Sequence, residues 1–64
     1  MEKILKCVDH HYALDGKVLI CALVLKDGTN GEWIEVTNEH LEGLDQETID
    51  EIHAFFPGEE FYYQ

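Results

Sequence analysis

The sequence predicts a small α+β domain, an antiparallel three-stranded β-meander followed by a C-terminal α-helix. Three observations lead to this fold class. An unbroken run of eight apolar residues, 18–25, lies between two Gly-containing turn signals, as in a strand buried on both faces. Mixed apolar and polar segments flank it at 2–14 and 32–36, and residues 46–56 carry an amphipathic helical stripe. With 64 residues, the chain is expected to form one domain, 1–64.

A tight turn joins the first predicted strand, residues 2–14, to the second. Asp15-Gly16 is a two-residue hairpin signal, because both central positions of a type I′ turn need a positive φ angle. This turn would pair Leu14 with Lys17. Because side chains alternate along each strand, this register would then assign every residue to one of two faces.

The same register places Cys7 and Cys21 on opposite faces and sets His10 across from Cys21. Cysteines that point apart cannot be bridged without moving the backbone, so we expect two free thiols. Unbridged cysteines in so small a chain are typical of a reducing, cytoplasmic setting.

Residues 32–36 are predicted as the third strand, with Lys26 opposite Glu32. A helix can cover only one face of the sheet, and we expect it to cover the face that holds these five residues: Val18, Ile20, Val24, Ile34 and Val36. The opposite face would then carry Val8, Tyr12, Leu19, Leu23, Leu25 and Trp33.

Two capping residues mark the predicted helical segments. Thr37 can cap a short helical turn over 38–42, and Asp45 is the expected N-cap of a longer helix over 46–56. The apolar stripe of that helix recurs at the i, i+3, i+4, i+7 spacing, and its acidic residues lie away from the stripe.

The apolar face that the helix leaves open needs a cover, because exposing it would cost a small domain several kcal/mol. Three kinds of cover would bury this apolar face. The tail aromatics Phe61, Tyr62 and Tyr63 can fold over it, the sheet can curl into a small SH3-like barrel, or a second chain can bind. In the last case a homodimer would form through a face that contains Tyr12, Leu23 and Trp33.

Charge is distributed very unevenly along the chain. The formal net charge is −10, yet all four lysines lie within residues 1–31, which carry no net charge. Residues 32–64 hold ten carboxylates and no Lys or Arg. Direct binding to nucleic acid is disfavoured, since phosphate recognition uses basic residues. The negative electrostatic field of these carboxylates favours a partner protein with a basic surface.

The sequence offers no strong catalytic, cofactor or metal motif. Seven potential ligands are present, but no Cys-x-x-Cys or His-x-x-x-His pair occurs among them: Cys7, Asp9, His10, His11, Cys21, His40 and His53. Both cysteines are expected in or beside the buried sheet, where thiols are usually inert. We therefore expect neither an enzyme nor a cofactor or metal site. The apolar runs are also too short for a membrane span.

The candidate partner-binding residues are carboxylates and aromatic anchors of the C-terminal half. Tyr and Trp are frequent interface anchors, and flat rings beside spaced carboxylates imitate a nucleic-acid strand. Solubility alone does not explain why residues 32–64 contain no Lys or Arg, so we expect their negative charge to contribute to partner binding. The set comprises Glu35, Glu39, Glu42, Glu47, Asp50, Glu51, Glu59, Glu60, Trp33, Tyr62 and Tyr63.

Several stretches together loosely resemble a chromo or chromo-shadow domain. They are Glu2-Lys3-Ile4-Leu5, Asp15-Gly16, Val24-Leu25-Lys26-Asp27-Gly28, Trp33, and Ile52-His53-Ala54-Phe55-Phe56. The resemblance implies a curved three-stranded sheet with a C-terminal helix. It does not carry over a methyl-lysine cage, because Leu25 stands where that cage needs an aromatic residue.

Two functions follow as expectations. The first is a small, cytoplasmic, acidic inhibitor that blocks the basic, nucleic-acid-binding surface of a nuclease, defence complex or polymerase, by DNA mimicry, as phage anti-defence proteins do. The second is a chromo-like or SH3-like interaction module that dimerises or binds a peptide through its apolar sheet face.

Overall fold

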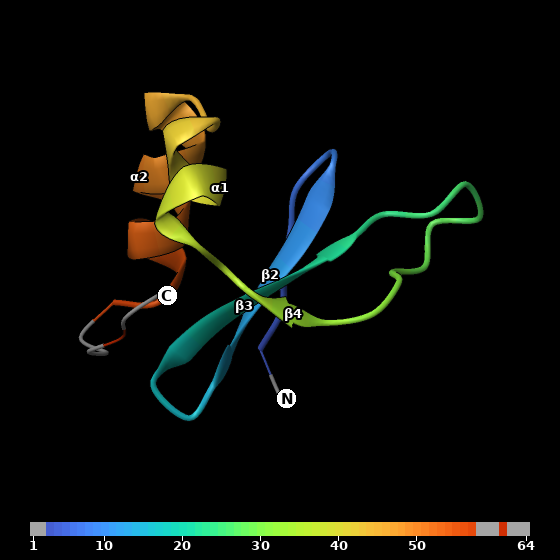
Figure 1. The fold of residues 1–64 in the computed structure, drawn as a ribbon, viewed down its shortest axis with the longest axis horizontal. Coiled ribbons are helices and arrows are strands. Elements are labelled where there is room, and N and C mark those ends of the chain that lie inside the picture. The colour runs from blue at the N-terminus through green and yellow to red at the C-terminus, as the bar shows by residue number, and fades with distance from the viewer. Residues whose placement is uncertain (1–2, 58–60, 62–64) are drawn as a thin grey trace.

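The computed structural model describes residues 3–57 and residue 61. In these residues four strands and two helices form a small α+β fold, the class that the sequence predicts. The strands pair antiparallel in the order β1-β2-β3-β4, and the two helices lie together on one side (Figure 1). The elements are β1 Leu5–Lys6, β2 His10–Asp15, β3 Val18–Leu23, β4 Ile34–Glu35, α1 Asn38–Glu42 and α2 Gln46–Phe55.

The sheet has four strands because the predicted first strand is split in two. The chain leaves the sheet between β1 and β2 and re-enters antiparallel, with the Cys7 amide donating to the His10 carbonyl at 3.0 Å. Val8, in this turn, is 90% exposed. The predicted three-stranded meander is therefore wrong, and β2 and β3 together form the centre of the sheet.

The β2–β3 hairpin turns one residue later than predicted. Asp15 pairs with Val18, so Gly16 and Lys17 form the loop. Of these two, only Gly16 has a positive φ angle, 63°, which suits a type II′ turn better than the type I′ turn that the sequence suggested. A lysine at a position that needs positive φ would be strained.

The new hairpin register keeps the predicted faces for β2 and β3, because each partner moves by two residues. One face presents Tyr12, Leu14, Leu19 and Cys21, and the other presents His11, Ala13, Ile20 and Ala22. The specific pairs change: Tyr12 lies across from Cys21, and His10 across from Leu23. The predicted His10–Cys21 pair is wrong.

The register between β3 and β4 differs from the prediction by an odd number of residues. Ile20 pairs with Glu35, whereas a Lys26–Glu32 pair would have set Ile20 opposite residue 38. An odd shift moves every side chain of a strand to the other face. Val36 therefore joins Leu19, whose carbonyl accepts a 3.0 Å hydrogen bond from the Val36 amide, and is fully buried.

The long β3–β4 connection causes this shift. Its ends are joined by a bridge between Val24 and Asn30, and by a 2.8 Å hydrogen bond from the Gly31 amide to the Leu23 carbonyl. These bonds end β3 before the predicted position, and the loop extends away from the helices (Figure 1).

Both helices cover the face of Tyr12 and Leu19, not the predicted face of Val18 and Ile20. The main core consists of Tyr12, Leu19, Cys21, Val36, Ile52 and Phe56. Partly buried apolar residues that include Leu5, Cys7, Leu44 and Phe61 pack around it. In the pairing of β1 with β2, Leu5 lies opposite Tyr12. Leu5 therefore shares the sheet face of Tyr12, which the helices cover.

Each helix begins at a side-chain cap. The Thr37 hydroxyl accepts a 3.1 Å hydrogen bond from the His40 amide at the start of α1. The Asp45 carboxylate accepts a 3.2 Å hydrogen bond from the Thr48 amide at the start of α2. These caps satisfy amides that have no partner inside the helix and hold the helix starts in place.

Cys7 and Cys21 belong to the same helix-covered side, so the prediction that they lie on opposite faces is wrong. The reason is the turn between β1 and β2, which reverses the chain and inverts the alternation for Cys7. Both cysteines are nevertheless free thiols.

Candidate functional site

The two helices carry most of the predicted acidic site. Glu39 and Glu42 lie on α1, Glu47, Asp50 and Glu51 lie on α2, and all five side chains are exposed. The two helices that carry these carboxylates are neighbours on one side of the molecule (Figure 1).

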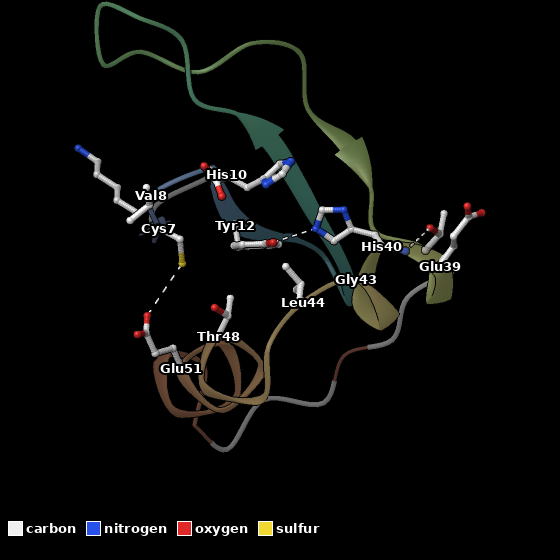
Figure 2. Close-up of a pocket in the computed structure, with 13 residues that line it drawn as sticks. Cys7, Val8, His10, Tyr12, Glu39, His40, Gly43, Leu44, Thr48 and Glu51 are labelled. Atoms are coloured by element: carbon white, nitrogen blue, oxygen red, sulfur yellow. Dashed lines mark hydrogen bonds between the residues drawn. The ribbon is translucent and has the colours of Figure 1, made fainter.

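The orientation of α2 follows from its helical period. Ile52 is 2% exposed and points into the core with Phe56, which turns Glu47, Asp50 and Glu51 outward. Figure 2 shows Glu51 at the edge of α2 that faces β1 and the turn after it. The outer face of the helix is therefore a band of carboxylates.

Other predicted site residues do not join this band. Glu35 pairs with Ile20 and lies on the sheet face that points away from the helices. Trp33 is half-buried just before β4, and the register that grouped it with Leu23 does not form. Glu59, Glu60, Tyr62 and Tyr63 lie outside the described residues.

The predicted homodimer face is changed by the structure. Tyr12 is 1% exposed beneath the helices and cannot contribute to an outer surface. Leu23 and Ile34, in contrast, are 57% and 58% exposed, and Leu25 is also exposed. Leu23 and Ile34 lie on the same sheet face as Cys21 but beyond the part that the helices cover, so with Leu25 they form a set of exposed apolar residues, here called the apolar strip.

A groove lies between the β1–β2 turn and the two helices (Figure 2). Its volume is about 820 Å3, which is within the usual size of ligand sites. Its lining combines groups from the sheet, the turn and both helices: Lys6, Cys7, Val8, Asp9, His10, Tyr12, Thr37, Glu39, His40, Gly43, Leu44, Thr48 and Glu51.

A tyrosine and two histidines meet on one side of this groove. The Tyr12 hydroxyl lies 2.8 Å from His40 Nε2, a hydrogen bond that connects β2 to α1. The ring of His10 meets that of His40 edge-on, with 4.8 Å between the ring centroids. Burial lowers the pKa of His40, and His10 lowers it further. Burial also raises the pKa of Tyr12, with smaller contributions from Cys21, Cys7 and Asp9. Both groups are therefore kept uncharged at neutral pH.

A cysteine and a glutamate face each other across the groove. The Cys7 Sγ atom lies 4.0 Å from Glu51 Oε2, a weak contact for a thiol donor (Figure 2). Burial raises the pKa of Cys7, and the Glu51 carboxylate raises it further. A nucleophilic cysteine needs a lowered pKa, so this environment opposes catalysis by Cys7. Burial likewise raises the pKa of Cys21.

The histidines do not gather into a metal site in the described part of the chain. No group of three or more His, Cys, Asp or Glu side chains among residues 3–57 and 61 has positions suited to hold a metal ion. His10 and His40 come together, but His53 stacks on Phe61 at the other side of α2.

The groove is the feature that the sequence did not reveal. Cys7, Asp9, His10 and His40 are visible as chemically capable residues, yet their meeting depends on the turn between β1 and β2 and on the placement of α1. A weak signal exists in Val8 and Asp9, which interrupt the alternation of the first predicted strand.

No helix in the described residues has the length and apolar character needed to cross a membrane. No protein-family model, curated protein or solved structure matches this chain.

Proposed function

We propose that this protein is a small acidic inhibitor that binds the basic, nucleic-acid-binding surface of another protein. One observation carries the proposal: five exposed carboxylates lie on two neighbouring helices, within a stretch that contains no Lys or Arg. The set is Glu39, Glu42, Glu47, Asp50 and Glu51.

Like charges on one surface repel one another, and i,i+4 pairs with lysine would relieve that repulsion at little cost. The chain has four lysines, and none of them lies on α1 or α2. Such a field raises the rate of association with a basic surface and disfavours binding to phosphate. A target that normally holds nucleic acid has the complementary charge, so DNA mimicry is the proposed mode of inhibition.

The proposed targets are a nuclease, a defence complex or a polymerase, as for inhibitors encoded by phages and mobile elements. The proposed setting is the cytoplasm, where free thiols such as Cys7 and Cys21 persist. We propose binding and not catalysis, since the raised pKa of Cys7 leaves it a poor nucleophile.

The first experiment is a tagged pull-down from bacterial lysate at low and high salt, with duplex DNA or RNA as competitor. The proposal expects a nucleic-acid-processing protein that competitor and salt both displace, because exposed charge pairs are screened by ions. A bound partner that is indifferent to both would contradict it.

The acidic face itself is tested by charge reversal. Glu47→Lys with Asp50→Lys should weaken binding to that protein at least about tenfold, since rim charges govern electrostatic association. The matched control is Asp15→Lys with Glu32→Lys, two exposed carboxylates away from α1 and α2. The control changes net charge equally and should retain binding. Equal loss in both variants would show that net charge, not this face, controls binding.

A second function is supported by the exposed apolar strip of Leu23, Leu25 and Ile34. The protein would then be an interaction module, chromo-like or SH3-like in use, that dimerises or captures a peptide with the apolar strip. Its binding would change little with salt, and Leu23→Glu or Ile34→Glu would abolish it while the helix variants bind normally. Sedimentation of the free protein measures the dimer directly.

A further inference from the structure

The groove beside the acidic helices has a charge pattern that selects one kind of occupant. Carboxylates from three separate segments line it: Asp9 from the β1–β2 turn, Glu39 from α1 and Glu51 from α2. Lys6 is the single lysine or arginine among the lining residues. A cation entering the groove would therefore meet negative charge from several directions.

The inner surface of the groove is uncharged and partly apolar. The Tyr12 hydroxyl holds the ring of His40, which is half-buried and lies beside the groove, whereas Tyr12 itself is buried beneath it (Figure 2). Leu44 and Thr48 extend this surface along the start of α2. Since burial and His10 lower the pKa of His40, its ring does not add a positive charge that would repel a cation.

The outer end of the groove adds an apolar rim and a free acceptor. Val8 is 90% exposed at the tip of the β1–β2 turn. Across the groove, Glu51 is exposed, and among residues 3–57 and 61 its one hydrogen-bond contact is the weak 4.0 Å approach of the Cys7 thiol. An apolar rim, a flat uncharged floor and an available carboxylate suit a long side chain with an apolar stem and a charged end.

We propose that this groove receives an arginine side chain of the target protein. This inference rests on the proposed function and names the residue type that the acidic face recognises. Arginine fits better than lysine because its planar guanidinium forms bidentate hydrogen bonds with a carboxylate and stacks on flat rings. Glu51 and Asp9 bind the guanidinium, and Val8 and Leu44 contact the stem.

The test uses N-acetyl-arginine-amide as the probe, titrated into the full 64-residue chain and followed by amide NMR shifts at pH 7.5. A ligand of this size is expected to bind with a Kd of about 1 mM. The shifts should be confined to groove residues such as Cys7, His10 and Thr48. N-acetyl-citrulline-amide has the same shape without the charge, and it should cause no shifts.

Two matched variants separate the groove from the general acidic field. Glu51→Gln removes a carboxylate at the groove and should weaken probe binding about fivefold, the upper range for an exposed charge pair. Glu47→Gln removes one from the same helix outside the groove and should leave binding unchanged. The amide spectrum of each variant also verifies that it is folded.

Each remaining outcome counts against the groove. The assignment would be overturned by shifts that spread over all acidic residues, or by equal weakening of binding in Glu51→Gln and Glu47→Gln. It would also be overturned by equal binding of the citrulline probe. The absence of any shift at a probe concentration 20-fold above the expected Kd would overturn it as well. The inhibitor proposal fails differently, because its test uses Glu47 and Asp50, neither of which lines the groove.

Discussion

Removing the hydroxyl of Tyr12 tests how the helices are attached to the sheet. The hydroxyl lies 2.8 Å from His40 Nε2, and the two residues are 28 positions apart in the chain. Tyr12→Phe keeps the buried ring and deletes this one bond. A net hydrogen bond stabilises a fold by about 0.5–1.5 kcal/mol. A domain of this length is stable by roughly 3–10 kcal/mol, so the loss would be a substantial share.

Urea unfolding followed by the fluorescence of Trp33, the only tryptophan, measures this loss. The midpoint should fall with an unchanged m-value, and Tm should fall by about 4–8 °C for each kcal/mol. A double-mutant cycle with His40→Gln isolates the interaction free energy of the pair. A coupling below about 0.3 kcal/mol, or a Tyr12→Phe variant as stable as the wild type, would refute the reasoning.

The same pair predicts a pH dependence of the free energy of unfolding. Burial, with a smaller effect of His10, lowers the pKa of His40 below its ordinary value of 6.5, so the unfolded chain binds this proton more readily. The stability from neutral His40 is therefore complete above pH 6.5 and is lost as pH falls below that value. The wild type should lose more stability than His40→Gln between pH 7.5 and 5.5. Parallel pH profiles would contradict this.

Three further predictions concern the core, a helix cap and a thiol. Ile52→Ala should lose about 2–5 kcal/mol in urea unfolding and Ile52→Val about 1, because Ile52 is buried in the core; a loss below 1 kcal/mol for alanine would mean that this packing is absent. Thr37→Ala should destabilise the fold by about 1 kcal/mol by removing the cap of α1, whereas Thr37→Ser should be nearly neutral, and similar losses in both would show that the hydroxyl is not the cap. Glu51→Gln should speed alkylation of Cys7 at pH 8, because the Glu51 carboxylate adds to burial in raising the pKa of Cys7. The control is Cys21, which should react only on unfolding. If mass spectrometry finds the same alkylation rate at Cys7 in both proteins, Glu51 does not have this effect.

Features of the fold that depend on short stretches of chain can be read from the sequence. Thr37 and Asp45 each accept a hydrogen bond from an amide three residues ahead, so the helix starts are encoded locally. The exposure of Glu47 and Asp50 follows from the 3.6-residue period once Ile52 is placed in the core. The α+β class follows from the same local patterns.

Pairings between distant segments decided the rest. The register of β3 with β4 differed from the prediction by an odd number of residues, and this alone moved Val36 to the helix side and Glu35 to the other. A turn without glycine or proline at residues 7–9 split the first strand and brought Cys7 to the side of Cys21. Neither the register nor the turn has a strong signal in the local sequence, since both depend on the hydrogen bonds that the β3–β4 loop and the β1–β2 turn form.

The sequence by itself determined where the two helices begin, the separation of charge along the chain and the outward direction of the α2 carboxylates. The tertiary structure alone decided which sheet face the helices cover and, with it, the groove where Tyr12, His40 and Glu51 meet. The physical reason is distance along the chain. Caps and helical periods involve neighbours within a few residues, whereas the groove requires the β1–β2 turn to meet helices about thirty to forty residues later.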